Sequence, residues 1–254
     1  MNTSAQTWNA DDYAAHAHFV PAFGKSVLDM LTLPAPARVL DLGCGDGALT
    51  CELIARGYQV LGVDASPDMV RAARERGVSA AVVDGHALPY PAGSFDAVFS
   101  NATMHWLTRP DVALAGVAHV LRPGGQFVAE FGGAGNVRRV VAALVAGLSA
   151  RGIAGAECIP WYFPSVGEYA QKLERAGFRV DVMAHFDRPT PLPGDVLGWI
   201  ATFGESFTRA LPAQARAEYL QEVRARLAPE LCDTDGRWAL DYVRLRFRAT
   251  KTGS

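Results

Sequence analysis

Two short stretches in the first third of the chain constrain its fold more than any other part of the sequence. The first is the apolar run 39–42, interrupted only by Asp41, which leads into the glycine-rich stretch 43–47 (GCGDG). The second is the run 60–63, which ends at Asp64. Short apolar runs bounded by turn residues are typical of buried strands, and glycine allows the tight turn between a strand and a helix. We therefore expect both runs to be strands of one sheet.

Strand and helix patterns alternate from this point to residue 131. Alternation of this kind predicts an α/β protein with a parallel sheet covered by helices on both faces. Strands are expected at 38–41, 59–64, 78–84, 95–100 and 126–131, and helices at 48–56, 67–76 (with Ser66 as its N-cap) and 111–121. Farther along, helices are expected at 137–149, 166–176, 196–207 and 214–227, and strands at 178–186 and 238–249.

The length of 254 residues fits a single domain with helical additions. Residues 1–33 are expected to form an N-terminal helical segment, because apolar residues follow helical spacing over 9–33 with a break near Pro21. The core is assigned to 34–190 and 236–254. The helical stretch 191–235 is too long for a hairpin between the last two strands, so we expect it to form a cap.

Composition excludes several classes of partner. The net charge of −2 creates no overall positive field for nucleic acid or an anionic membrane. No apolar run approaches the ~20 residues that span a bilayer, and the polar N-terminus does not resemble a signal peptide. We therefore expect a cytoplasmic protein that binds neither nucleic acid nor membrane, either a monomer or a homodimer. The four cysteines match no zinc spacing, and His16 and His18 have no evident third ligand, so no metal is expected.

The glycine turn and Asp64 point to a cofactor that carries a ribose. Ligands of open parallel sheets bind at the carboxyl ends of the strands, where Gly43, Gly45 and Asp64 are placed. A carboxylate there can accept hydrogen bonds from both ribose hydroxyls. The spacing differs from the G-x-G-x-x-G of dinucleotide sites. Asp41 lies just ahead of the turn and Asp46 at the mouth of the following helix, where they would repel a pyrophosphate but suit a cationic ligand.

These segments resemble the class I S-adenosylmethionine-dependent methyltransferases. Residues 41–47 are similar to the first motif of that family, and Asp64 to its ribose-binding acid. Residues 84–87, 95–98 and 121–125 are similar to three later segments. The resemblance implies a Rossmann-like, mostly parallel seven-stranded sheet with an antiparallel last strand, and S-adenosyl-L-methionine as cofactor.

The resemblance also implies individual cofactor contacts. The Asp84 side chain would contact the adenine amine, with the backbone of Gly85 or His86 beside the ring and Ala65 and Met69 against it. For Met69, an ordinary core position remains an equal alternative.

A narrower similarity to trans-aconitate methyltransferase-like bacterial proteins covers residues 100–106 and 130–133. It implies that Asn101 lies near the methionine part of the cofactor. It also implies that the N-terminal segment is a lid over the cofactor, through Trp8, Tyr13 and Phe19.

His105 is the candidate catalytic base, because it follows the fourth strand at the rim where substrate should meet cofactor. An orienting or packing role is the alternative, since a carboxylate acceptor would need no base. Trp106 could face the sulfonium or plug the core. Glu130 could bind substrate or hold the lid, with a solvated strand-end acid as the alternative. The remaining candidate substrate residues are Tyr13, Trp161 and Tyr162, of which the last two could instead belong to the core of the cap.

Arg244, Arg246 and Arg248 alternate along the last strand and therefore share one face. We expect this face to be solvated, with a surface for an anionic substrate as the alternative.

The function expected from these residues is methyl transfer from S-adenosylmethionine to a small molecule, through a carboxylate or hydroxyl, by in-line displacement. The alternatives are a nicotinamide-dependent reductase on a similar sheet and a cofactor-binding module without catalysis. RNA or protein substrates are disfavoured, because the chain has neither a basic extension nor an Asn-Pro-Pro-Tyr type of motif.

Overall fold

The computed structural model of the protein describes the backbone of residues 19–253 and the side chains from Gly24 onward. The chain divides into two compact units. Of the described residues, the larger unit includes 19–134, 162–186 and 244–253, and the smaller unit includes 135–161 and 187–243. The predicted cap, 191–235, falls within the smaller unit.

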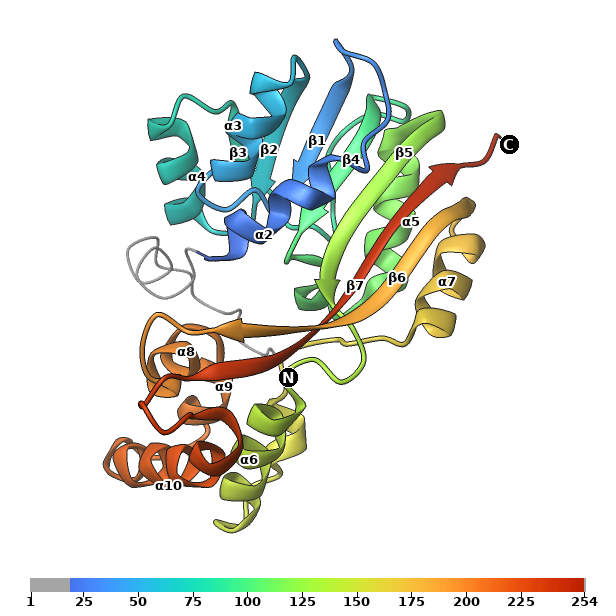
Figure 1. Cartoon of the computed structure of the whole chain (residues 1–254). Coiled ribbons are helices and arrows are strands. Elements are labelled where there is room, and N and C mark those ends of the chain that lie inside the picture. The colour runs from blue at the N-terminus through green and yellow to red at the C-terminus, as the bar shows by residue number, and fades with distance from the viewer. Residues whose placement is uncertain (1–18, 254) are drawn as a thin grey trace. The chain divides into compact units, whose positions relative to one another are not determined.

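A seven-stranded sheet has the strand order β3-β2-β1-β4-β5-β7-β6 (Figure 1). The pairs β1–β2, β2–β3, β1–β4 and β4–β5 are parallel, and β7 runs antiparallel to β5. This order confirms the predicted mostly parallel sheet with an antiparallel last strand. The strands are β1 (Arg38–Leu42), β2 (Gln59–Asp64), β3 (Ala80–Val82), β4 (Phe95–Asn101), β5 (Leu121–Gly132), β6 (Phe178–Pro191) and β7 (Ala239–Lys251).

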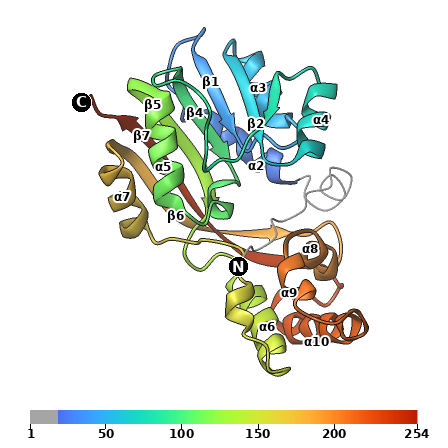
Figure 2. The ribbon, with the colours of Figure 1, turned by 180° about the vertical axis from the view of Figure 1, so that it is seen from behind.

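Helices cover both faces of the sheet in the larger unit, as predicted. Successive strand side chains point to opposite faces, so neighbours such as Val39 and Leu40 enter different cores. Val39 packs with residues of α2 and α3, which lie in front of the strands in Figure 1. Leu40 packs with residues of α5 and α7, and α5 lies in front in Figure 2. The helices of this unit are α2 (Phe19–Leu28), α3 (Ala48–Ala55), α4 (Pro67–Glu75), α5 (Pro110–Val120) and α7 (Val166–Arg175).

The helix ends follow local chemistry. Ser66 caps α4 as predicted, because its side chain accepts a hydrogen bond from the Met69 N–H at 3.3 Å, and Pro67 occupies the first turn. Pro21 lies in the first turn of α2, where its missing N–H costs nothing, so it does not break the helix. Helix α2 ends at Leu28, which is earlier than the predicted 33.

The smaller unit has an aromatic core. Trp161 is almost fully buried, and its ring centroid lies 6.0 Å from those of Trp199 and Phe207. The helix predicted at 196–207 is divided at Gly204 into two shorter helices. The elements that lie wholly in this unit are α6 (Arg138–Ser149), the 3-10 turn η2 (Gly155–Cys158), α8 (Val196–Phe203), α9 (Glu205–Arg209) and α10 (Ala213–Leu231). Across the described part of the chain, no helix has both the length and the apolar character needed to cross a bilayer.

Candidate functional site

The glycine turn is fastened to the end of β2. The N–H groups of Gly43 and Cys44 both donate to the carbonyl of Val63, at 2.7 and 3.0 Å. Gly43, Gly45 and Gly47 all have positive φ angles, between 55° and 82°, which side chains disfavour. A Cβ added at Gly45 would meet no atom within 4 Å, so the turn leaves open space in front of this residue.

Asp64 lies directly against this turn. Its Oδ2 accepts a hydrogen bond from the Gly45 N–H at 3.0 Å, and its Oδ1 accepts one from the Ser66 N–H at 2.9 Å. Burial raises the pKa of Asp64, although these backbone hydrogen bonds oppose the shift. Each carboxylate oxygen still has capacity to accept from a ligand hydroxyl.

Asp41 is buried beneath the turn. Its exposed fraction is 2%, and the Thr50 hydroxyl donates to its Oδ2 at 2.6 Å. Burial raises the pKa of Asp41 to about 7, with the Thr50 hydrogen bond opposing this shift and the neighbouring Asp64 adding to it. Two carboxylates in one buried corner suit a ligand that brings positive charge.

The segment after β4 closes the other side of the turn. Asn101 Oδ1 belongs to the buried side-chain atoms that have no hydrogen-bond partner in the described part of the chain. A buried carbonyl oxygen without a donor is costly, so a ligand amine would stabilise it. Ala102 has a φ of 57°, an uncommon conformation for a residue with a side chain. Thr103 follows, and its Oγ1 donates to the carbonyls of Gly43 and Asn101 at 3.3 and 3.2 Å.

The predicted adenine contacts follow β2 and β3. Ala65 is exposed, whereas Met69 and Gly85 are buried. Asp84 is largely exposed, and its Oδ1 accepts hydrogen bonds from the backbone N–H and the ring Nδ1 of His86, both at 2.9 Å. Partial burial would raise the pKa of Asp84, but these hydrogen bonds outweigh it and hold the pKa below its usual value. Free carboxylate capacity therefore remains where the adenine amine is predicted.

His105 lies in the 3-10 turn η1 (Met104–Trp106), between the ends of β4 and β5. It is 8% exposed, and its Nδ1 accepts a hydrogen bond from the Gly132 N–H at 3.3 Å. Burial lowers the pKa of His105 well below its usual value, and the nearby Arg244 lowers it further. The imidazole is therefore neutral at physiological pH.

Glu130 is fully buried at the end of β5. Arg246 donates to its Oε2 at 2.6 Å through Nε, and Arg244 donates to its Oε1 at 3.4 Å. Arg246 also donates to the Ser26 hydroxyl of α2 at 2.9 Å. The alternative of a solvated strand-end acid is wrong, and so is the expected solvated face of Arg244, which is 6% exposed. The carboxylate instead links β5 to β7, and Arg246 extends this link to α2.

Replacing Glu130 by glutamine is expected to lower the free energy of unfolding by about 3 kcal/mol, because two guanidinium groups would lose the carboxylate that compensates them. Chemical denaturation measures the change. Glu75→Gln is the control, since Glu75 is 72% exposed and only loosely paired, and its loss should cost less than about 0.5 kcal/mol. Equal stability of the two variants would contradict the structural role of Glu130.

The predicted substrate residues lie in different places. Trp106 flanks His105, with ring centroids 5.5 Å apart. Tyr162 belongs to the larger unit, where its hydroxyl donates to Glu168 at 2.6 Å and its N–H donates to the carbonyl of His105 at 2.8 Å. Trp161 belongs to the aromatic core of the smaller unit. Tyr13 and Trp8 lie outside the described residues, as does the side chain of Phe19.

The sequence did not lead us to predict two residues of this site, Thr50 and Thr103. Thr50 holds Asp41, and Thr103 holds the glycine turn. Thr50 could have been found, since it lies one helical turn beyond Asp46 on the helix that the turn opens. Nothing in the sequence indicates the contact between Thr103 and Gly43, which are brought together by the pairing of β1 with β4.

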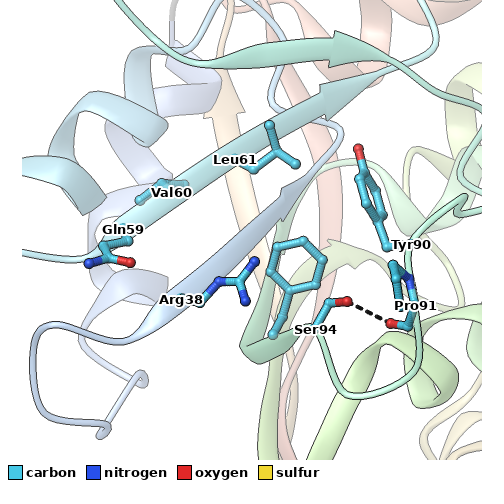
Figure 3. Close-up of a pocket in the computed structure, with 8 residues that line it drawn as sticks. Arg38, Gln59, Val60, Leu61, Tyr90, Pro91 and Ser94 are labelled. Atoms are coloured by element: carbon cyan, nitrogen blue, oxygen red, sulfur yellow. Dashed lines mark hydrogen bonds between the residues drawn. The ribbon is translucent and has the colours of Figure 1, made fainter.

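A separate hollow lies at the other ends of the strands (Figure 3). It is formed at the beginnings of β1, β2 and β4, whereas the glycine turn and Asp64 lie at the carboxyl ends of β1 and β2. None of the predicted site residues lines it. The lining residues are Arg38, Gln59, Val60, Leu61, Tyr90, Pro91, Ser94 and Phe95.

Comparison with known proteins identifies the family. A family model described as a methyltransferase domain matches residues 40–129, which include the glycine turn, Asp64 and His105. An uncharacterized methyltransferase of Schizosaccharomyces pombe is 42% identical over 96% of this chain and 98% of its own length. The chain belongs to the class I S-adenosylmethionine-dependent methyltransferases. The resemblance noted in the sequence is confirmed, and the alternative of a nicotinamide-dependent reductase is excluded.

One further sequence relative and one solved structure are similar to this methyltransferase. A trans-aconitate 2-methyltransferase of Methylobacterium nodulans is 34% identical over 96% of this chain and 98% of its own length. Among solved structures, a putative methyltransferase of Bacillus halodurans has the same fold, with a TM-score of 0.62 and 16% identity over 90% of this chain and 98% of its own.

The site residues fit S-adenosylmethionine as the cofactor. Asp64 offers acceptors for ribose hydroxyls, and Asp41 with Asn101 Oδ1 offers acceptors for a cationic amine. The open space at Gly45 allows the backbone to approach the ligand.

Proposed function

We propose that this methyltransferase acts on a small molecule that accepts the methyl group through a carboxylate or hydroxyl oxygen. The observation that carries the proposal is the alignment with trans-aconitate 2-methyltransferase, which extends over 98% of that protein and therefore includes the regions outside the common methyltransferase domain. The net charge of −2 also supports a small acceptor over nucleic acid.

We assign the cofactor to the carboxyl ends of β1, β2 and β4. In this assignment Asp64 binds the ribose, Asp84 binds the adenine amine, and Ala65 and Met69 contact the adenine ring beside Gly85 and His86. Asp41 and Asn101 hold the amino-acid end, and the glycine turn at Gly43 and Gly45 leaves room for it. When bound, S-adenosylmethionine supplies a methyl group that is activated by a sulfonium.

The protein contributes alignment and exclusion of water rather than acid catalysis. The leaving group of the reaction is a neutral thioether, so no general acid is needed. Alignment of the two reactants can lower the barrier by several kcal/mol, within the ~7–11 kcal/mol available to well-oriented reactions. We place the acceptor beside η1, with His105 and Trp106 as its neighbours. Glu130, Trp161, Tyr162 and Tyr13 remain proposed contributors to acceptor binding, with Glu130 acting through Arg244 and Arg246.

An acceptor screen tests this proposal. The protein is incubated with S-adenosylmethionine labelled in its methyl group and, in parallel, with small carboxylic acids including trans-aconitate, small alcohols, bulk tRNA and bulk protein. We expect label in a small-molecule product. Label that appears only in tRNA or in protein would overturn the proposed acceptor class.

Cofactor affinity is expected to rise with pH through the neutral range. Burial places the pKa of Asp41 at about 7, so the ligand-free protein holds a proton there that a cationic ligand must displace. The raised pKa also makes stability depend on pH, because the folded protein holds this proton more tightly than the unfolded chain does. The contribution of Asp41 to the free energy of unfolding is fully present below about pH 4, where both states are protonated, and is lost as the pH rises through 7. Calorimetry with S-adenosylhomocysteine near pH 6, in two buffers of different ionisation enthalpy, should detect proton release. Asp41→Asn should remove this release, and wild-type binding without it would contradict the assignment of Asp41.

A further inference from the structure

We propose that His105 serves the acceptor as a hydrogen-bond donor through Nε2–H, and that the acceptor is therefore a carboxylate already ionised before it binds. This inference rests on the proposed function and deepens it, because it selects carboxylate over hydroxyl and assigns His105 an orienting role in place of the predicted base.

The tautomer of the His105 imidazole is set by the hydrogen bond from Gly132. A neutral imidazole has one N–H donor and one acceptor nitrogen. The Gly132 N–H points at Nδ1 of His105, and a backbone N–H can only donate, so Nδ1 must be the acceptor. The proton therefore lies on Nε2, which in this state donates and cannot accept a proton from a substrate.

This arrangement is held in place. The carbonyl of His105 accepts from the Tyr162 N–H at 2.8 Å, which fixes the backbone of η1. The ring packs against Trp106 and Phe163, whose ring centroids are 5.5 and 5.6 Å away. Gly132 is itself held in β5 by its pairing with Arg244 of β7. A ring that packs against two aromatic side chains and is hydrogen-bonded at Nδ1 keeps its tautomer and its direction.

Nε2 of His105 is accessible to a ligand. His105 retains 8% exposure. Within the described residues, Nε2 of His105 makes no hydrogen bond. If this atom were also buried, it would belong to the buried side-chain atoms that have no partner, and it does not. The accessible part of His105 therefore includes Nε2. Thr103, two residues before His105, contacts the glycine turn, so η1 lies at the end of the sheet where the methyl donor is placed.

The charged groups around the ring keep it neutral. The charge of Arg244 in β7 lowers the pKa of His105. Arg244 is paired with Glu130 of β5, and Glu130 also binds Arg246. From its own side, η1 contributes the uncharged Trp106, and the segment before α7 contributes the uncharged Phe163. Protonation of the ring would place a second cation beside Arg244, so the donor state persists across the physiological range.

The chemistry then selects the acceptor. A carboxylate oxygen attacks the methyl carbon with a lone pair that becomes the new oxygen–carbon bond. The carbon–sulfur bond breaks, and the electron pair of that bond goes to sulfur. The products are a methyl ester and a neutral thioether, and no proton is transferred. A hydroxyl or ammonium acceptor would have to lose a proton to a base, and Nε2–H of His105 cannot take it. The same N–H can hold one carboxylate oxygen while the other reacts.

The tautomer is tested without any turnover. Protein labelled with ¹⁵N in its histidines is studied by NMR between pH 6 and 8, and the His105 signals are assigned from their absence in His105→Gln. We expect Nδ1 to have the shift of an unprotonated nitrogen and Nε2 that of a protonated one, unchanged over this range. A proton on Nδ1, or a ring that titrates within this range, overturns the proposal.

Two variants separate a donor from a base. Glutamine offers an N–H at similar reach but cannot act as a base, whereas alanine offers neither. With an acid that the screen shows to be methylated, His105→Ala should lower kcat/KM by about 10- to 100-fold, the usual range for a hydrogen bond to a charged group, and His105→Gln should restore most of it. Equal losses in the two variants overturn the donor role, provided that both bind S-adenosylhomocysteine as the wild type does.

The product itself tests the acceptor class. Label transferred to a carboxylate is released as volatile methanol by mild alkali, whereas label on a hydroxyl or amine is retained. Alkali-stable label in a small molecule would refute this inference while leaving the proposed function intact. Label found only in macromolecules would refute both.

Discussion

Asp64→Ala is expected to abolish binding of S-adenosylhomocysteine, with a loss of affinity of at least about 100-fold. The reason is that Asp64 is the only predicted ribose acceptor, and hydrogen bonds to a charged group contribute about 1.5–3 kcal/mol each. Alanine would also release the Gly45 and Ser66 N–H groups that the carboxylate now holds, so the glycine turn would lose its anchor. Isothermal titration calorimetry measures the change.

Two controls separate recognition of the ligand from support of the turn. Asp64→Asn keeps the size of the side chain and one acceptor oxygen, so we expect it to retain part of the affinity. Asp68→Ala removes an exposed acid from the first turn of α4, where its partner is Arg71, and should leave binding unchanged. Wild-type affinity in Asp64→Ala would show that the ribose lies elsewhere.

Gly45→Ala and Gly43→Ala are expected to fail in different ways. At Gly45 an added Cβ meets nothing within 4 Å, so the protein should fold, with a cost of about 1–2 kcal/mol for the positive φ. The methyl group would instead occupy space that we assign to the cofactor, and affinity for S-adenosylhomocysteine should fall by about 10-fold or more, as expected for lost close contact and hydrogen bonding.

At Gly43 the added Cβ would lie 2.0 Å from Thr103 Oγ1 and 2.6 Å from its Cβ, which no rotamer change can relieve. This variant should therefore lose stability as well as binding. Thermal unfolding and calorimetry on both variants test the distinction. Normal binding by a folded Gly45→Ala protein would place the ligand away from the turn.

The sheet and the position of Asp64 beside the glycine turn were predictable because their signals are local. The apolar runs 39–42 and 60–63, the glycine turn and the terminal Asp64 all lie within one strand–helix–strand unit, and strand position fixes where their side chains meet. The parallel direction of the strands was predictable from the alternation of strands and helices. The comparisons confirmed the family.

The acceptor side was less predictable because its contacts join distant segments. Glu130 is buried because β5 and β7 are antiparallel and pair Glu130 with Arg246 and Gly132 with Arg244, a register that no short pattern indicates. The same register presents the Gly132 N–H that sets the tautomer of His105. Trp161 and Tyr162 are adjacent in sequence but belong to different units, a division that no sequence pattern at these positions indicates.

We assign the binding of S-adenosylmethionine to the glycine turn, Asp41 and Asp64. A crystal structure of the protein grown with S-adenosylhomocysteine tests it most directly. We expect the ribose hydroxyls on the carboxylate of Asp64, the amino-acid end beside Gly45 and Asn101, and the adenine near Asp84 and Met69. Density for the ligand at another place, with no ligand beside the glycine turn and Asp64, would show that this assignment is wrong.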